Sequence, residues 1–289
     1  MTATAGTNWG RWGPDDERGA LNLVGDHTRK AAAELVRTGK AYPLAHPVDE
    51  RTPHTPGRHA VWQTTHISRN PKSQVGTIDD ILTLHTHIGT HLDALCHYWG
   101  PEGLYNGFDD EHITSNGAPR LGVHNVEPIV TRAVVVDLTR RCPAGKAGWG
   151  HEVTVADLTS ELDSAGISLS PGDAVLLGTG WERELHETPE TYTYGEPGIG
   201  PDAAEWLAGQ DPVLIGADTW AVEAVPPAVR GVGLPVHRTL LNRYGVYILE
   251  NLSLGTLLAE RGTCAGLLVV APLLVRGGAG SPVTPVFVC

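Results

Sequence analysis

The chain has 289 residues and carries 21 Lys and Arg against 33 Asp and Glu, a formal net charge of −12. A protein this acidic repels phosphate backbones, so nucleic acid is excluded as an expected partner. Hydrophobic residues make up 41% and charged residues 19%, which excludes general disorder and, with the length, favours one domain over 1–289.

The sequence predicts a cytoplasmic protein without a membrane partner. Its longest apolar run, residues 265–275, is about half of the roughly 20 residues that a membrane span needs, and Pro272 interrupts it. The N-terminus lacks the basic and apolar regions of a signal peptide. Four widely spaced cysteines form no C-x-x-C pair and predict no disulfide scaffold: Cys96, Cys142, Cys264 and Cys289.

The first third of the chain predicts few regular elements. Residues 1–25 form an irregular arm, and residues 26–39 have helical spacing with Gly39 as a stop. Residues 47–80 are rich in Pro, His and Thr, and predict a loop with one strand near 61–67. The apolar and β-branched residues of 81–90 predict a buried strand.

Strands and helices alternate in the second half of the chain. Short Val, Ile and Leu runs predict strands at 133–138, 174–177, 213–215, 246–249 and 265–270. Helices are predicted at 155–165, with Thr154 as its cap, at 201–208 and at 254–261. Because the alternation covers only this half, we expect a mixed α/β domain with an antiparallel or barrel-like sheet.

Residues 85–97 read HTHIGTHLDALCH and hold four of the 14 histidines. His91 and Asp93 are two positions apart, so they share one face of a strand. A strand that turns at Gly89 brings His87 to the same point. Three such ligands suit a divalent metal and leave sites open for water and substrate. A His-rich turn can also be a surface hydrogen-bond network, but four histidines with an aspartate among apolar neighbours favour a metal.

A second candidate pair lies near the C-terminus. His237 and Glu250 flank the run HRTLLNRYGVYILE, which predicts a helix, a turn at Gly245 and a returning strand. This arrangement brings both ends of the segment close together. Each residue taken alone is better explained as structural.

These motifs together resemble the metal-dependent cyclase family, which includes bacterial kynurenine formamidase and isatin hydrolase. The resemblance rests on the string from His87 to Asp93 with His97 after it, on His237 and Glu250, and on the opening run WGPDDERGALN at residues 12–22. It therefore touches nearly the whole chain, and it implies the family's swivelling β/β/α fold.

The resemblance also implies roles for single residues. His87, His91 and Asp93 match the ligands of a first metal, whereas His237 and Glu250, with Asp93 as a bridge, match those of a second. His97 matches the residue proposed to transfer protons. The sequence leaves open whether one ion or two are bound and whether the metal is Zn or Mn. The family also implies a homo-oligomer.

We therefore expect a hydrolase that acts on a small amide, formamide, lactam or lactone. A bound divalent cation lowers the pKa of water towards about 7 and polarises a carbonyl group. Eight tryptophans make an aromatic substrate plausible. Two alternatives stay open: a cyclase or dehydratase of a polyketide-like or amino-acid-derived intermediate, and a small-molecule-binding protein without turnover. The chain has no G-x-S-x-G nucleophile motif and no phosphate-binding P-loop.

Overall fold

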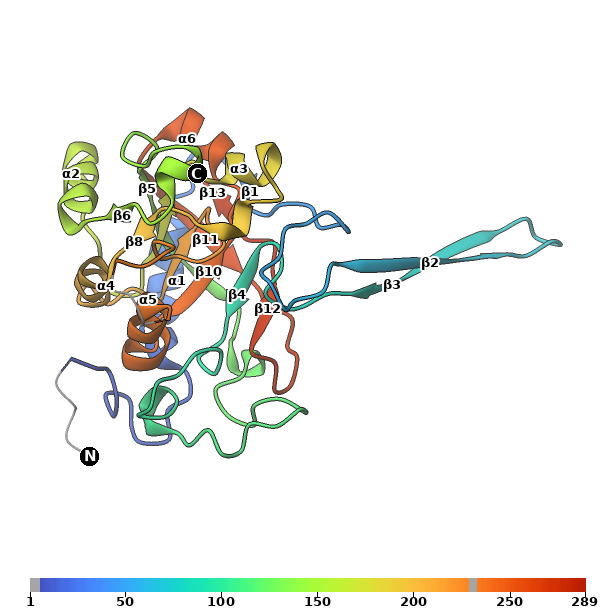
Figure 1. Ribbon diagram of the computed structural model, residues 1–289, viewed down its shortest axis with the longest axis horizontal. Coiled ribbons are helices and arrows are strands. Elements are labelled where there is room, and N and C mark those ends of the chain that lie inside the picture. Colours follow the sequence, from blue (N-terminus) through green and yellow to red (C-terminus); the bar gives the residue numbers. More distant parts are fainter. Residues whose placement is uncertain (1–5, 229–232) are drawn as a thin grey trace.

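The computed structural model of the chain describes residues 6–228 and 233–289. A nine-stranded mixed sheet forms its centre and curls as a half-barrel, in the order β1-β13-β11-β5-β7-β9-β10-β4-β12 (Figure 1). The four strands β5, β7, β9 and β10 run parallel, and the strands on either side of them pair antiparallel. The predicted mixed α/β fold with a barrel-like sheet is therefore confirmed.

The strands of this sheet come from the whole chain. They are β1 (Ala41–Pro43), β4 (His91–Asp93), β5 (Ile129–Asp137), β7 (Ala174–Gly178), β9 (Leu214–Ala217), β10 (Tyr247–Glu250), β11 (Cys264–Val270), β12 (Gly280–Pro282) and β13 (Val286–Val288). Two further pairs lie outside it: β2 (Trp62–Arg69) with β3 (Gly76–Thr83), and β6 (Glu152–Val153) with β8 (Gly198–Ile199).

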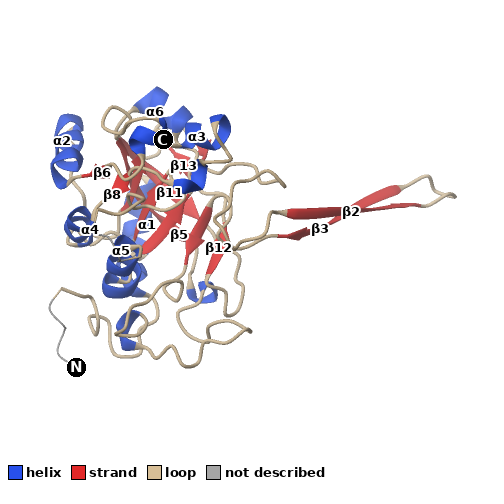
Figure 2. Ribbon diagram, viewed as in Figure 1, coloured by secondary structure: helices blue, strands red, loops and turns tan. Residues whose placement is uncertain are grey.

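Helices surround this sheet, and the long helices α2 and α4 lie on the side of the body away from β2 and β3 (Figure 2). The α-helices are α1 (Asp26–Ala33), α2 (Val155–Ala165), α3 (Glu182–Glu187), α4 (Pro201–Ala208), α5 (Pro235–His237) and α6 (Gly255–Arg261). The 3-10 helices are η1 (Gly19–Leu23), η2 (Tyr105–Gly107), η3 (Val123–Asn125), η4 (Gly145–Gly148) and η5 (Tyr192–Tyr194), and η6 (Arg238–Tyr244) is a π-helix. No helix among the described residues is long and apolar enough to cross a bilayer.

The three helices predicted for the second half agree with α2, α4 and, to within one residue, α6, whereas α3 was not predicted. The Thr154 hydroxyl accepts a hydrogen bond from the backbone N–H of Asp157, and Gly166 ends α2 in the left-handed conformation. Leu158 and Leu162, one turn apart, bury one face of this helix. Helix α4 starts at Pro201, whose fixed φ suits a first helical position.

Three predicted elements differ from the structure. Helix α1 ends at Ala33, six residues before Gly39, because the chain then tightens into i−3 hydrogen bonds at Leu35 and Val36. The expected loop over 47–80 contains most of a two-stranded hairpin. The buried strand expected over 81–90 is wrong: β3 ends at Thr83 and is exposed, and residues 84–90 form turns because Gly89 adopts a positive φ of 65°.

Candidate metal centre

Strand β4 holds two polar side chains in the middle of the core. It lies between β10 and β12, and its register places His91 opposite Glu250 and Asp93 opposite Ile248. His91 and Asp93 are two positions apart and so share one face. His91 Nε2 lies 3.0 Å from Glu250 Oε2, and all three side chains are buried.

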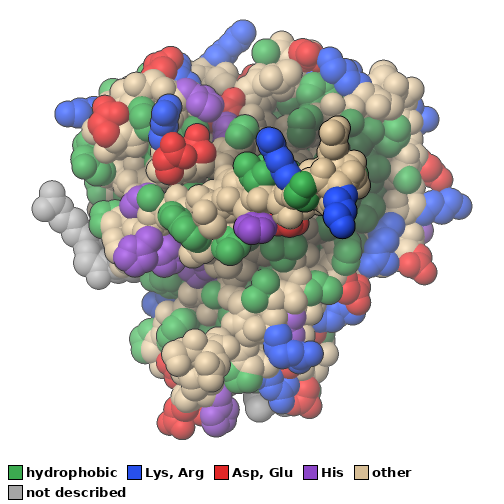
Figure 3. Space-filling model, turned by 90° about the vertical axis from the view of Figure 1, so that its right-hand side faces the viewer, with side chains coloured by type: hydrophobic (Ala, Val, Ile, Leu, Met, Phe, Trp, Pro, Cys, Tyr) green, Lys and Arg blue, Asp and Glu red, His purple; other side chains and the backbone are tan. Residues whose placement is uncertain are grey.

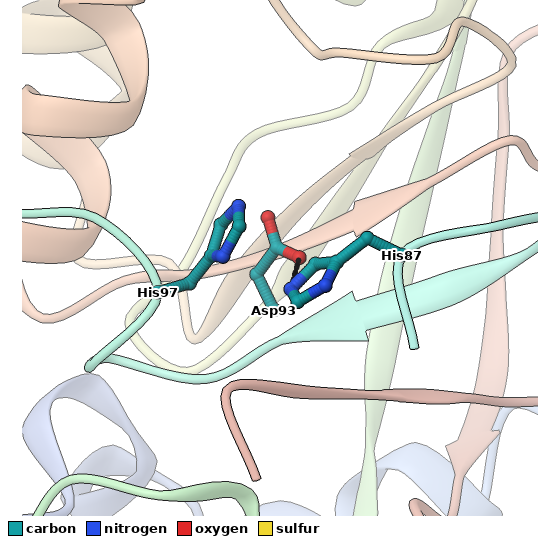
Figure 4. Close-up of side chains that lie close together, drawn as sticks. All are labelled: His87, Asp93 and His97. Atoms are coloured by element: carbon teal, nitrogen blue, oxygen red, sulfur yellow. Dashed lines mark ion pairs between the residues drawn. The ribbon is translucent and has the colours of Figure 1, made fainter. Parts of the chain in front are cut away.

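The turn before β4 brings in His87. A Cβ atom at Gly89 would lie 2.5 Å from Val48 Cγ1, so this close approach and the positive φ both require glycine. His87 Nε2 lies 3.2 Å from Asp93 Oδ1 (Figure 4). The His87 side chain keeps 10% of its surface exposed, so the cluster meets solvent on this side.

His237 comes from a distant segment and is held by a glutamate. It ends α5, directly before the π-helix η6, and Gly245 then turns the chain into β10 with φ 64°. The helix, turn and strand predicted for this segment are therefore confirmed. His237 Nε2 lies 3.2 Å from Glu250 Oε1 and 3.7 Å from Asp93 Oδ2. Its Nδ1 lies 2.6 Å from Glu223 Oε1.

Glu223 is the residue of this site that the sequence analysis missed. Its carboxylate accepts the backbone N–H groups of Val236 and His237 as well as facing the His237 ring. A carboxylate on Nδ1 fixes the tautomer of a histidine and directs Nε2 towards a ligand position. Glu223 stands 14 residues before His237 in a run without a recognisable motif, and no sequence signal identifies it.

His97 packs against His87. The two rings stack with centroids 3.9 Å apart, and Figure 4 shows His97 and His87 on either side of the Asp93 carboxylate. Burial lowers the pKa of His97, which favours its neutral, proton-accepting form. The other two polar residues of the motif lie elsewhere: His85 is exposed beside His59, and Cys96 is buried with its Sγ towards Gly278 O.

Several buried polar atoms of the cluster lack a hydrogen-bond partner within the described part of the chain. They are His87 Nε2, His91 Nε2, both Asp93 carboxylate oxygens and Glu250 Oε1. Buried polar groups are almost always satisfied, so a concentration of orphaned ligand atoms indicates a missing partner. Two ligands about 2.0–2.1 Å from one ion in a tetrahedral site lie roughly 3.3 Å apart. The closest separations here, between 3.0 and 3.4 Å, match that value.

The charges of the cluster also fit a cation. Burial opposes ionisation of Glu250, but the neighbouring imidazoles of His237 and His91 outweigh it and lower the pKa of Glu250 to about 2. Burial likewise opposes the protonation of His91, yet Glu250 and Asp93 raise its pKa. Two buried carboxylates therefore draw positive charge to the place where they converge. A divalent ion supplies that charge, and the N and O donors suit Zn or Mn.

The grouping by distance differs from the one that the family resemblance implies. Ligand atoms of His91, Asp93 and Glu250 lie within 4.8 Å of one another, and so do those of His87, Asp93 and His97. Asp93 belongs to both groups, which is the position of a bridging carboxylate. All six side chains expected in the site are thus brought together, with His97 placed as closely as the proposed ligands.

Comparisons with known proteins give a consistent result. Residues 42–224 match the family model described as "Putative cyclase", more than half of the chain. The chain is 29% identical over 222 residues to the kynurenine formamidase of Polaromonas naphthalenivorans, covering 77% of this chain and 80% of that protein. It is 25% identical over 207 residues to the isatin hydrolase of Roseibium aggregatum, and this match covers 70% of this chain and 71% of that protein.

Solved structures show the same fold. A crystal structure described as a novel cyclase has a TM-score of 0.89 and 34% identity, covering 98% of this chain and 99% of that one. An isatin hydrolase bound to the product analogue thioisatinate has a TM-score of 0.66, and the match covers 93% of this chain and 97% of that chain. At 20% identity, this second likeness concerns the fold alone.

Proposed function

Because the chain belongs to the cyclase family, we propose that it is a metal-dependent hydrolase of a small amide, formamide, lactam or lactone. The observation that carries this proposal is the cluster of orphaned, buried ligand atoms on His87, His91, Asp93 and Glu250, with His237 beside them. Relatives named for formamide and isatin hydrolysis support the amide class. A small aromatic substrate fits these names and the tryptophan-rich sequence.

Five side chains are the proposed ligands of one or two divalent ions: His87, His91, Asp93, His237 and Glu250. His87, His91 and His237 offer Nε2, and the first two face Asp93 while the third faces Glu250. Glu223 keeps His237 in the tautomer that leaves Nε2 free. A bound divalent cation acidifies water towards neutral pH and polarises a substrate carbonyl.

His97 is the proposed proton carrier. It lies at the solvent-facing side of the cluster with His87, and its burial keeps the ring neutral. A neutral imidazole accepts a proton from water and, once protonated, donates it to a leaving amine or alkoxide. Asp93 and Glu250 offset the positive charge that His97 carries between these two transfers.

The test is metal content measured together with activity. We expect the purified protein to bind one or two equivalents of Zn or Mn and to hydrolyse an N-aryl formamide or isatin. Asp93→Ala removes the carboxylate shared by both groups of ligands and should abolish both properties. Glu102→Ala, which removes an exposed ion pair with Arg238, is the control and should change neither. Protein that binds no metal after addition of Zn or Mn would refute the proposal.

A further inference from the structure

Arg58 lies beside the candidate metal centre, in the loop of residues 44–61 that joins β1 to β2 at the root of the β2–β3 hairpin (Figure 1). Its Nη1 atom donates a hydrogen bond to the backbone carbonyl oxygen of His87. The side chain of His87 is partly exposed, so the guanidinium lies on the side where the cluster meets solvent. Only one histidine side chain separates the guanidinium from a proposed ligand atom, His87 Nε2.

Arg58 is half-buried, and it has no carboxylate partner in the part of the chain that the structure describes. The other half-buried arginines among these residues all pair with a carboxylate: Arg18 with Glu127, Arg29 with Asp26, Arg132 with Asp173, Arg238 with Glu102 and Arg243 with Glu205. An arginine is rarely withdrawn from water unless an anion pairs with it. Arg58 therefore lacks the kind of partner that every comparable arginine has.

Most of the hydrogen-bonding capacity of Arg58 is unused. A guanidinium has five N–H donors in a planar fork, which matches the two oxygens of a carboxylate. The bond to the His87 carbonyl is the one contact that the side chain makes with the described residues. Its Nε and Nη2 atoms have no partner there, and neither is buried, so a solute can reach them. A pair of donors is thus left for a ligand.

Local hydrogen bonds order the backbone around Arg58. The Thr52 side chain is buried, and its hydroxyl accepts the backbone N–H of Asp49. The backbone N–H of Arg58 bonds to the carbonyl oxygen of Thr55, which closes a turn that contains Pro56. A side chain presented by an ordered loop loses less conformational freedom when a ligand binds. The loop therefore holds the guanidinium near the metal centre in advance.

A groove of about 370 Å³ adjoins Arg58. Its walls include several prolines and the rings of His54 and Tyr194, and its volume is that of a site for a small molecule. Glu50 and Glu190 also line it, but neither forms an ion pair with Arg58. Figure 3 views the protein from the side of the hairpin and shows histidine, basic and apolar side chains on this surface. Arg58 thus borders both the groove and the metal centre.

We propose that Arg58 determines substrate specificity by binding a carboxylate group of the amide, lactam or lactone, while the scissile carbonyl lies at the metal centre. This inference rests on the proposed function. The chain as a whole carries −12 and repels anions, so an anionic substrate needs a cation at the site itself. A carboxylate fits better than a phosphate dianion, because one guanidinium balances one negative charge and matches two oxygens.

The test compares pairs of substrates that differ in charge: ortho-formamidobenzoate with ortho-formamidobenzamide, and an isatin carboxylate with the corresponding carboxamide. We expect the metal-loaded wild-type protein to prefer the carboxylate of at least one pair by roughly 10- to 100-fold in kcat/KM, as a hydrogen bond to a charged group allows. Arg58→Met removes the guanidinium but keeps an apolar stem. It should abolish the preference by raising KM for the carboxylate, with kcat unchanged.

Arg51→Met is the matched control, because it removes the same charge from the same loop, where Arg51 is exposed beside Glu50. It should keep the preference. A preference that survives Arg58→Met would overturn the proposal, and so would an equal effect of Arg51→Met. If Arg58 were merely structural, its loss would slow charged and neutral substrates alike. Metal-bound wild-type protein that hydrolyses the neutral compounds as fast as the carboxylates would overturn this inference alone, whereas hydrolysis of none of the four would overturn the proposed function with it.

Discussion

At the scale of single residues, the site depends on where each imidazole directs its second nitrogen. His91 Nδ1 lies 2.8 Å from Gly89 O, and His237 Nδ1 lies 2.6 Å from Glu223 Oε1. Both contacts place a proton on Nδ1, so Nε2, which points towards the carboxylates, is the nitrogen available to a metal. The sequence predicts the residues that converge, because spacing and the family motif mark them. It does not predict Glu223, whose role arises only when two loops meet.

His97 allows a prediction that separates proton transfer from metal binding. We expect His97→Ala to keep its metal and to lose turnover by about 10²-fold or more, since positioned proton transfer contributes that much to a rate. Metal analysis and initial rates on the same samples provide the measurement. His85→Ala, which removes an exposed histidine from the same motif, should leave both unchanged. Loss of a metal equivalent in His97→Ala would make His97 a ligand and not a proton carrier.

At the scale of elements, the sequence predicts the longer packed strands and helices of the second half, and it also predicts a strand near 61–67, which is the exposed strand β2. The predicted 155–165 and 201–208 helices agree with α2 and α4, since caps, proline and apolar spacing all act locally. The run at 81–90 contains Ile81 and Leu82, which suggested a buried strand. Both side chains are exposed on strand β3 of the β2–β3 hairpin. Periodicity shows that a residue is suited to burial, but it does not show whether its own core or another surface covers it.

The start of α6 gives an element-scale prediction about pH. The Glu182 carboxylate accepts the backbone N–H of Leu254 at 2.8 Å. Burial and the charge of Asp218 raise the pKa of Glu182 from 4.5 to about 7. A raised pKa means that the folded state binds the proton more tightly. The stability from this group is therefore fully present below pH 4.5 and is lost as the pH rises through about 7.

Glu182→Gln keeps a carbonyl oxygen for Leu254 but never ionises. We expect the variant to gain roughly 1–3 kcal/mol in free energy of unfolding relative to wild type between pH 5 and pH 8. Urea unfolding at both pH values measures this difference. Glu187→Gln is the control, because Glu187 is exposed and ends α3, the helix that Glu182 begins. This variant should show no such pH dependence. A difference for Glu182→Gln that is the same at both pH values would contradict the argument.

At the scale of the whole molecule, the cluster brings together distant parts of the chain, and a metal bound there, as proposed, would link them. A ligand that binds only the folded state stabilises it by about 4 kcal/mol at a thousand times its dissociation constant. Each kcal/mol shifts the melting temperature of a protein of this size by about 2–4 °C. We therefore expect a chelator to lower the melting temperature by about 10 °C, as measured by scanning calorimetry. Asp93→Ala should melt at the same temperature with and without chelator; an equal response in both proteins would contradict a site at Asp93.

The mixed α/β architecture is predictable from the sequence, but the order of its strands is not. Strands β5, β7, β9 and β10 follow chain order and lie side by side, although the long segments 138–173, 179–213 and 218–246 separate them in the sequence. Strand β4 is different, because it follows the β2–β3 hairpin early in the sequence but pairs with strands from the end of the chain. Only three residues long, it carries little sequence signal of its own, and its place depends on long-range pairing.

That pairing has a consequence for how the protein is made. Strand β4 leaves the ribosome early, but β10 and β12, which enclose it, follow more than 150 residues later. At about 5–20 residues per second, roughly 10–40 s of synthesis separate β4 from β12. During this interval His91 and Asp93 are already outside the ribosome without the strands that hold them in place. The candidate site is therefore completed only after β12 has been synthesised, and a chain that terminates before residue 280 would lack one of the two strands that support it.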